Sequence, residues 1–523
     1  MVNDIVLVGG TVIDGSGAPG RAADVAVRDG RIAAVAEPGA LEAAERIDVT
    51  GLVVAPGFID IHSHADFTLS LSPTAESQLA QGVTTLIGGN CGQSPFPVTD
   101  RNRVPSGLAG SGDLELAWDD LDGFAAAVEA SRPAINLGLQ VGHNAIRSAI
   151  LGDEDRAPSP DELDRMCAEV TAAARAGAFG FSTGLIYPPG LFAATDEVVT
   201  LVRTAAEAGL TYSTHVRNET DHVIAAVDEA LDAATRAGAR LQVSHLKSMG
   251  PGNVGKSRIA LDHLHAARAE GLDVACDVYP YTASSTSLAS RLPAWALDGG
   301  REDVARRLAD PATQARIVAD LTARFGQDID PAGIVLAELG PGPFADRAGQ
   351  SIVDIAHDIG RSPAEVVLLV LAGHGDVAIV NHAIDADDLL HILRDPHCAI
   401  ASDGWVMDLT GPGVPHPRSF GTFARVLGHY VREIGALTLP EAVRKMTSLP
   451  AERLGLTDRG LVRAGLAADL TVFDPATIAD RATYEQPRQA AVGVRAVLVN
   501  GVPVVRDGVA TGARGGRVLR KGR

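Results

Sequence analysis

Residues 53–66 read VVAPGFIDIHSHAD, an apolar run with a Pro-Gly turn that ends in two histidines, His62 and His64. Side chains alternate across a strand, so both imidazoles turn to the same side and can hold one metal ion together. A His-x-His pair alone is weak evidence, because two ordinary histidines arise at this spacing by chance. The surrounding residues, Pro56 to Asp60 and Asp66, favour the metal site.

The pattern of residues 53–66 returns along the middle of the chain, where apolar runs end in polar residues. These runs alternate with Ala-rich stretches of helical periodicity, two of which, 162–177 and 223–238, close with Gly. The candidate strands are VVAPGFIDIH, VTTLIGGN, INLGLQVGH, FGFSTG, LTYSTH, RLQVSH, LDVACDVYP and CAIASD. This alternation predicts an α/β fold, a (β/α)8 barrel, with an open doubly wound sheet as the alternative. Further apolar runs at 334–336 and 377–380 leave the strand count at seven or eight.

The two ends of the chain have a different pattern, with short strand-like runs separated by turns such as Asp29-Gly30 and Asp507-Gly508. We expect residues 1–55 and 457–523 to pair into one small β domain and residues 56–456 to form the barrel. Between Tyr281 and His374 a helical, acidic stretch delays the last strand. We interpret it as an inserted lid or subdomain at about 285–345.

Composition narrows the class of protein. The 523 residues are 46% hydrophobic and carry a formal charge of −20, without the basic stripe that nucleic-acid binding needs. The four cysteines are too few for a disulfide framework and favour a reducing compartment. The first residues show no basic segment or sustained apolar run, so we expect no leader, and no stretch approaches the about 20 apolar residues that span a bilayer. We therefore expect a cytoplasmic enzyme with a small-molecule substrate, no nucleic-acid or membrane partner, and an oligomeric state that the sequence leaves open.

Metal-competent residues recur where candidate strands end, and in a barrel those ends share one face. The candidate ligands are His62, His64, Cys91, His215, His245 and Asp403. Cys91 lies in the Gly-rich GGNCGQSP loop, where a thiolate can approach a metal ion. Its other possible function is that of a catalytic nucleophile. The non-functional alternative is a buried, inert thiol. Several histidines at separate strand ends suit a metal better than a Cys-His couple. Asp403 is the expected general base, which passes a proton to the leaving amine.

Cations and hydroxyls near these strands are candidates for substrate binding. Lys247 and Arg418 can bind a carboxylate of the substrate. The alternative is that both are solvated cations on the surface. Tyr187, Tyr279, Tyr281 and Ser284 are candidate pocket hydroxyls, although core packing explains them nearly as well. His143 and Arg147 are placed at the mouth without an assigned role.

GFIDIHSHAD, GGNCGQSP, STGLIYPPG, STHVRNE, VSHLKSMG, DVYPYTASST, IASDG and HPRSFGTF, in this order, resemble the N-acyl-D-amino-acid deacylases, or D-aminoacylases, of the amidohydrolase superfamily. The resemblance covers the whole chain. It implies a distorted TIM barrel, a β-sandwich built from both termini, and hydrolysis of N-acyl-D-amino acids.

The resemblance also implies roles for single residues. The tight zinc site falls on Cys91, His215 and His245, and a second, weaker position on His62 and His64 with Cys91 bridging. Asp403 is catalytic. The implied carboxylate-binding set is Lys247, Tyr279, Ser284 and Arg418, with Tyr281 and Ser285 as alternatives to the tyrosine and serine.

Many superfamily relatives bridge two metals with a lysine on the fourth strand, but FSTGLIY has none, which favours the cysteine-bridged subgroup. The competing hypotheses are a cyclic-amide hydrolase of the hydantoinase or dihydroorotase type and a non-catalytic assembly protein on the same fold.

Overall fold

The computed structural model describes residues 3–99 and 117–522. Its central sheet has eight parallel strands in the order β16-β12-β11-β10-β9-β8-β7-β6. Each predicted strand run contains one of them. The strands are β6 (Phe58–Asp60), β7 (Val83–Gly88), β8 (Asn136–Gly142), β9 (Gly180–Gly184), β10 (Thr211–His215), β11 (Leu241–Val243), β12 (Val274–Val278) and β16 (Cys398–Ile400).

The first and last strands of this sheet meet at their carboxyl ends. Asp403 N donates to His62 O at 2.8 Å, and His64 N donates to Gly404 O at 2.8 Å. A parallel bridge between Ser63 and Gly404 lies between them. The sheet therefore closes into the predicted barrel, and the open doubly wound alternative is wrong.

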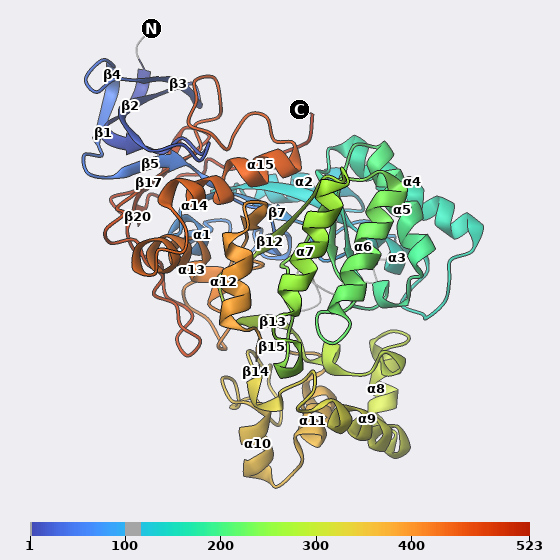
Figure 1. Cartoon of the computed structure of the whole chain (residues 1–523). Coiled ribbons are helices and arrows are strands. Elements are labelled where there is room, and N and C mark those ends of the chain that lie inside the picture. Colours follow the sequence, from blue (N-terminus) through green and yellow to red (C-terminus); the bar gives the residue numbers. More distant parts are fainter. Residues whose placement is uncertain (1–2, 100–116, 523) are drawn as a thin grey trace.

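Helices between the strands cover the outside of the barrel (Figure 1). They are α1 (Glu76–Leu79), α2 (Leu121–Ala130), α3 (His143–Ile150), α4 (Pro160–Ala176), α5 (Thr195–Glu207), α6 (Val223–Ala237), α7 (Lys256–Ala269), α12 (Ala386–Arg394), α13 (Arg418–Arg425), α14 (Leu439–Met446) and α15 (Ser448–Leu454). Helix α4 begins with a capping box between Ser159 and Glu162. Helices α4 and α6 end at Gly177 and Gly238, whose φ angles of 98° and 67° suit glycine. None of the described helices is long and apolar enough to cross a bilayer.

Strands from both chain ends form one nine-stranded sheet, seen at the upper left of Figure 1. They are β1 (Asn3–Val12), β2 (Arg21–Arg28), β3 (Arg31–Ala36), β4 (Ala43–Asp48), β5 (Val53–Pro56), β17 (Leu470–Phe473), β18 (Val494–Val499), β19 (Val502–Arg506) and β20 (Val509–Ala510). The two predicted turns join β2 to β3 and β19 to β20. Asp29 and Asp507 have φ angles of 51° and 49°, and each is followed by a glycine with positive φ, as such hairpins require.

The terminal sheet curls over a hydrophobic cluster that both ends of the chain share. Leu7 and Val25 from the N-terminal strands pack with Leu470 and Leu498 from the C-terminal strands. A bridge between Arg31 and Ala467 joins β3 to the segment before β17. The association of the two termini follows from this shared core. The exact domain bounds given above stay predictions.

An insertion precedes the last barrel strand and lies at the bottom of Figure 1. It contains β13 (Ala283–Ser287), α8 (Arg301–Ala309), α9 (Pro311–Arg324), β14 (Ile334–Leu336), α10 (Ile352–Ile359), α11 (Pro363–His374) and β15 (Ala378–His382). Its strands form a separate sheet in the order β13-β15-β14, so the apolar runs at 334–336 and 377–380 belong here and not to the barrel. Residues from Leu288 to Ile379 share a hydrophobic cluster of their own. The predicted bounds of about 285–345 fall inside this segment.

Candidate metal centre

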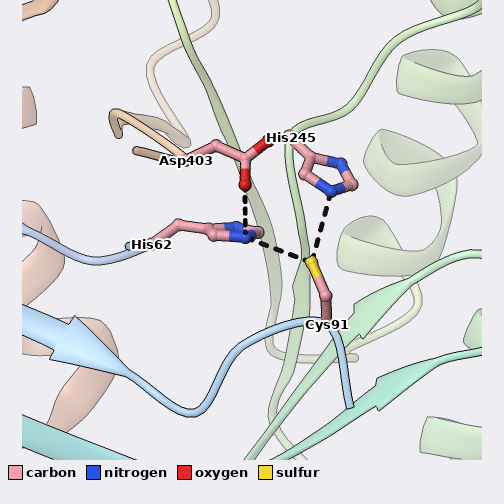
Figure 2. Close-up of side chains that lie close together, drawn as sticks. All are labelled: His62, Cys91, His245 and Asp403. Atoms are coloured by element: carbon pink, nitrogen blue, oxygen red, sulfur yellow. Dashed lines mark hydrogen bonds and ion pairs between the residues drawn. The ribbon is translucent and has the colours of Figure 1, made fainter. Parts of the chain in front are cut away.

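Four buried side chains meet at the carboxyl ends of the barrel strands: His62, Cys91, His245 and Asp403 (Figure 2). Each offers one ligand atom, and these atoms lie within 4.8 Å of one another. Cys91 Sγ is 3.3 Å from His62 Nε2 and 3.5 Å from His245 Nε2. Asp403 Oδ1 is 3.3 Å from His62 Nε2. The barrel thus brings together residues that are more than 300 positions apart in the sequence.

His215 lies beside this group through His245. The two ring centroids are 4.3 Å apart, and His215, Glu219 and His245 form a second set of possible ligands. Both ring nitrogens of His215 are buried without a hydrogen bond, and Glu219 Oε2 is 3.4 Å from His215 Nε2. A buried imidazole whose nitrogens make no hydrogen bond is costly, so these nitrogens are available as metal ligands.

The backbone at the centre is held in an unusual conformation. Cys91, His245 and Asp403 have φ angles of 54°, 35° and 51°, in the left-handed region that side chains rarely adopt. Such strain persists only where the surrounding structure imposes it, and it concentrates at functional sites. Three of the four residues in Figure 2 therefore have the strained backbone that is typical of functional sites.

The Cys91 thiol is surrounded by imidazoles. Burial raises its pKa, but the charges of His62 and His245 and the hydrogen bond with His245 outweigh burial and hold the pKa well below the ordinary value. A thiolate, several imidazoles and a carboxylate are the donor set that suits zinc. These residues fit such an ion.

His64 stands at the edge of the cluster. Its Nε2 is 3.1 Å from Asp403 Oδ1, and its ring stacks on Trp405 with centroids 5.6 Å apart. His64 Nδ1 is buried without a hydrogen bond. His64 is thus joined to the other predicted ligands through Asp403.

Comparison with known proteins agrees with this geometry. The model of the Amidohydrolase family matches residues 45–505. The chain belongs to this family. The D-aminoacylase of Alcaligenes xylosoxydans xylosoxydans is 39% identical over 99% of this chain and 98% of its own length. The N-acyl-D-glutamate deacylase of the same organism is 40% identical over 99% and 96%.

A solved structure of the same family shares the fold. It is the N-acyl-D-glutamate deacylase from Bordetella bronchiseptica, complexed with zinc and a phosphonate inhibitor that mimics the tetrahedral intermediate of the reaction. It has a TM-score of 0.85 and 38% identity, and the match covers 99% of this chain and 100% of that chain. The family predicted from the sequence motifs is therefore confirmed.

In this amidohydrolase both predicted substrate cations are buried against acids. Arg418 Nη1 donates to Asp403 Oδ2 at 2.6 Å, and Arg418 Nη2 donates to Ser285 O at 3.2 Å. Lys247 Nζ contacts Glu219 Oε1 and lies 2.9 Å from His245 Nδ1. Burial raises the pKa of Asp403, but Arg418 and His62 outweigh it and hold this pKa well below the usual range.

The predicted hydroxyls fall into two groups. Tyr279 OH is buried without a hydrogen bond, and its ring lies 5.0 Å from the Arg418 guanidinium, whereas Tyr281 OH donates to Pro417 O at 3.5 Å. The ring of Tyr187 lies 4.9 Å from that of His215. Ser284 Oγ donates to Met249 Sδ at 3.4 Å. The structure thus places Tyr279 and Tyr187 against predicted site residues, whereas Ser284 contacts Met249.

His143 and Arg147, expected at the mouth of the site, lie on α3 and pair with a carboxylate of the helix layer. His143 Nε2 is 2.9 Å from Glu197 Oε1, and Arg147 Nη1 donates to Glu197 Oε2 at 2.6 Å. All three residues are buried. These two interactions tie α3 to α5 and do not involve the residues of the metal cluster.

Two acids at the centre, Glu219 and Asp277, were not among the predicted site residues. Glu219 Oε1 is 3.2 Å from His245 Nδ1, and Asp277 Oδ1 is 3.1 Å from His62 Nδ1. Carboxylates that orient metal-binding histidines in this way are common around metal sites. Glu219 follows His215 by four residues in STHVRNE, and Asp277 precedes Tyr279 by two in DVYPYT, so both lie within the quoted motifs.

The absence of a bridging lysine has a steric reason in this structure. Gly184 ends β9, the fourth barrel strand, and a Cβ placed there would lie 2.0 Å from Cys91 O. The backbone of the Cys91 loop therefore occupies the space that a side chain at this position needs. The observed path of the Cys91 loop and a side chain at position 184 therefore exclude each other.

Gly184→Ala is expected to lower the free energy of unfolding by about 1–3 kcal/mol, the usual cost of overpacking, and to weaken metal binding by displacing the Cys91 loop. Thermal unfolding and metal content of the purified variant measure both effects. Gly340→Ala is the matched control, because a Cβ at Gly340 meets nothing within 4 Å. Wild-type stability and metal content in Gly184→Ala would show that the loop does not depend on this contact.

Proposed function

We propose that this amidohydrolase uses zinc to hydrolyse the amide bond of N-acyl-D-amino acids, releasing a carboxylate and a D-amino acid. The observation that carries the proposal is the buried cluster of Cys91, His62 and His245 with Asp403 directly against it. Full-length similarity to D-aminoacylase and N-acyl-D-glutamate deacylase, and the zinc and inhibitor complex of the latter's Bordetella relative, support the metal and the substrate class.

Cys91, His215 and His245 would hold the tight zinc ion. His62 and His64 would form the second, weaker position, with Cys91 shared between the two. The low pKa of the Cys91 thiol favours the thiolate that a shared ligand requires. The unpartnered ring nitrogens of His215 and the unpartnered Nδ1 of His64 are consistent with this assignment.

Zinc held there supplies Lewis-acid polarisation of the amide carbonyl and makes water more acidic. Asp403 accepts a proton from the attacking water through Oδ1 and returns it to the leaving nitrogen, because an amine leaves poorly unless it is protonated. Arg418 holds Oδ2 of the same carboxylate and so fixes its orientation. The second proton of the water passes from the new carboxylic acid to the released amine, so water and amide become carboxylate and ammonium without a net change in protons on Asp403.

Substrate binding rests on Lys247, Arg418 and Tyr279, which surround the cluster. Their chemistry suits the α-carboxylate of an N-acyl amino acid, with the guanidinium as a planar donor and the ammonium as a point charge. The free hydroxyl of Tyr279 adds a donor that the protein itself does not use. Tyr187 beside His215 and Ser284 on β13 complete the proposed set.

The competing hypotheses find less support. A cyclic-amide hydrolase of the hydantoinase type usually carries the bridging lysine, for which Gly184 leaves no space. A non-catalytic assembly protein has no need of three strained residues and a buried thiolate at one point. All four cysteines are free, which supports the proposal of a reducing, cytoplasmic location.

The proposal is tested with the zinc-loaded protein and matched substrate pairs. N-acetyl-D- and N-acetyl-L-amino acids with apolar and acidic side chains are compared with a hydantoin and dihydroorotate, and release of free amine or ring opening is measured. We expect turnover of N-acetyl-D-amino acids only. Turnover of the L-enantiomers alone, or of the cyclic amides alone, would refute the proposed substrate class.

Tyr279→Phe is expected to lower kcat/KM by about 10- to 100-fold, which corresponds to one hydrogen bond to a charged group. Stability and zinc content should stay at the wild-type level, because the hydroxyl has no protein partner to lose. Steady-state kinetics and metal analysis make the comparison. Tyr281→Phe is the control, since Tyr281 OH faces Pro417 O; an equal loss in both variants would count against a role for Tyr279 in substrate binding.

A further inference from the structure

A chain of buried hydrogen bonds runs from α15 through the inside of the barrel to His62. Arg453 Nε donates to Gln242 Oε1 at 3.2 Å, and Gln242 Nε2 donates to Asp277 Oδ2 at 2.9 Å. Asp277 Oδ1 then lies 3.1 Å from His62 Nδ1. Arg453, Gln242, Asp277 and His62 are each 5% exposed or less. Water therefore does not compete for these bonds.

The direction of each bond in this chain is determined. A guanidinium only donates, so Gln242 must present its oxygen to Arg453 and its amide nitrogen to Asp277. A carboxylate only accepts, so Asp277 takes the hydrogen of Gln242 and needs a hydrogen from His62 Nδ1. Asp277 Oδ1 also accepts from His245 N at 2.8 Å, which holds this oxygen in place.

When Nδ1 of His62 carries the hydrogen, the free lone pair of the ring lies on Nε2. That nitrogen points to the opposite side, 3.3 Å from Cys91 Sγ and 3.3 Å from Asp403 Oδ1. In a neutral imidazole only one nitrogen carries a hydrogen, and the partner of that nitrogen decides which one is free to bind a metal. The chain therefore aims the His62 lone pair into the cluster.

We propose that Arg453, Gln242 and Asp277 are positioning residues that fix the tautomer of His62 and so set the affinity of the second, weaker zinc position. This inference rests on the proposed function, because it assumes that His62 belongs to that position. The tight position on Cys91, His215 and His245 does not use the His62 ring. Breaking the chain should therefore weaken the second zinc ion selectively.

Gln242→Met and Asp277→Asn break the chain in two ways. Methionine has nearly the size of glutamine but lacks the donor and acceptor that join Arg453 to Asp277. Asparagine at position 277 replaces one carboxylate oxygen by an NH2 donor. If this NH2 group faces Gln242 Nε2, two donors meet; if it faces His62 Nδ1, it favours the opposite tautomer of His62. If Asp277→Asn fails to fold because His245 N loses its acceptor, Gln242→Met still tests the proposal.

Zinc titration of the metal-free proteins against a chromophoric chelator gives the affinity of each binding step. We expect the second step to weaken by about 10- to 100-fold in both variants, while the first step changes little. Nitrogen-15 NMR of ring-labelled histidine, with His62 assigned by its substitution, should show the Nδ1-protonated form in the wild type and its loss in Asp277→Asn. A purely structural role would not move that tautomer signal.

Asp273→Asn is the matched control. Asp273 pairs with Arg453 at the outer end of the chain, and its ion pairs within the described residues are with Arg453 and Arg240, not with Gln242 or His62, so the variant should bind both zinc ions as the wild type does. An unchanged second step in Gln242→Met and Asp277→Asn, or an equal loss in Asp273→Asn, would overturn the inference. If the wild type binds one zinc ion and hydrolyses N-acetyl-D-amino acids, the inference about His62 is wrong but the proposed function stands. If the wild type binds no zinc, the inference and the proposed function are both wrong.

Discussion

Asp403→Asn should lower kcat for N-acetyl-D-amino acids by about 10²- to 10⁴-fold, the range that a general acid–base group contributes. Asparagine has the shape of aspartate and keeps an oxygen for Arg418, but its amide cannot accept the proton of the attacking water. Asp403 Oδ1 lies 3.1 Å from His64 Nε2 and 3.3 Å from His62 Nε2, so it stands where that proton is released.

The measurement is kcat on zinc-loaded protein, with zinc content determined on the same sample. Zinc in the tight position should be retained, which separates loss of the base from loss of the metal. Asp480→Asn is the control, because Asp480 also pairs with an arginine, Arg425, at 3.1 Å but lies outside the cluster. Near wild-type kcat in Asp403→Asn would exclude Asp403 as the general base.

Cys91→Ser should weaken zinc binding by at least about 100-fold and abolish activity. Loss of a residue that only supports a ligand already weakens metal binding by up to about 100-fold, and loss of a direct ligand should cost more. The thiolate is the softest donor of the cluster and the ligand assigned to both zinc positions, so its loss affects both ions. Serine keeps the size of the side chain, although its hydroxyl does not ionise near neutral pH.

Equilibrium zinc titration and activity after zinc addition test this variant. Cys167→Ser is the matched control, since Cys167 lies on α4 in the helix layer and is a free cysteine like Cys91. If Cys91→Ser bound zinc as tightly as the wild type, the assignment of Cys91 as a shared ligand would be wrong.

The barrel was predictable because polar residues mark the strand ends. His62, His215 and His245 each follow an apolar run, and strand ends of a parallel barrel must share one face. The hairpins at both chain ends were predictable from turn chemistry, since Asp29-Gly30 and Asp507-Gly508 both occupy the hairpin positions that require positive φ.

The supporting acids were harder to predict. Asp277 sits in the middle of an apolar strand, and which imidazole it meets depends on how β12 lies beside the other strands, not on local pattern. Glu219 comes from the loop after β10, and the sequence does not tell whether it faces His215 or solvent. Long-range packing decides both contacts, so the sequence motifs contained these residues without revealing their partners.

Backbone strain and neighbouring hydroxyls also lay beyond the sequence. The left-handed φ of His245 and Asp403 is uncommon for residues other than glycine and persists because the surrounding structure holds it. Tyr279 and Tyr281 are two positions apart, and only the path of the chain after β12 turns Tyr279 toward Arg418 and Tyr281 toward Pro417.

The most direct test follows hydrolysis of N-acetyl-D-methionine and N-acetyl-L-methionine while the metal-free protein is titrated with zinc. The proposed function predicts no activity without zinc, a rise in D-enantiomer hydrolysis as the tight position fills, and no comparable hydrolysis of the L-enantiomer. Full activity of the metal-free protein, or hydrolysis of the L-enantiomer alone, would contradict it.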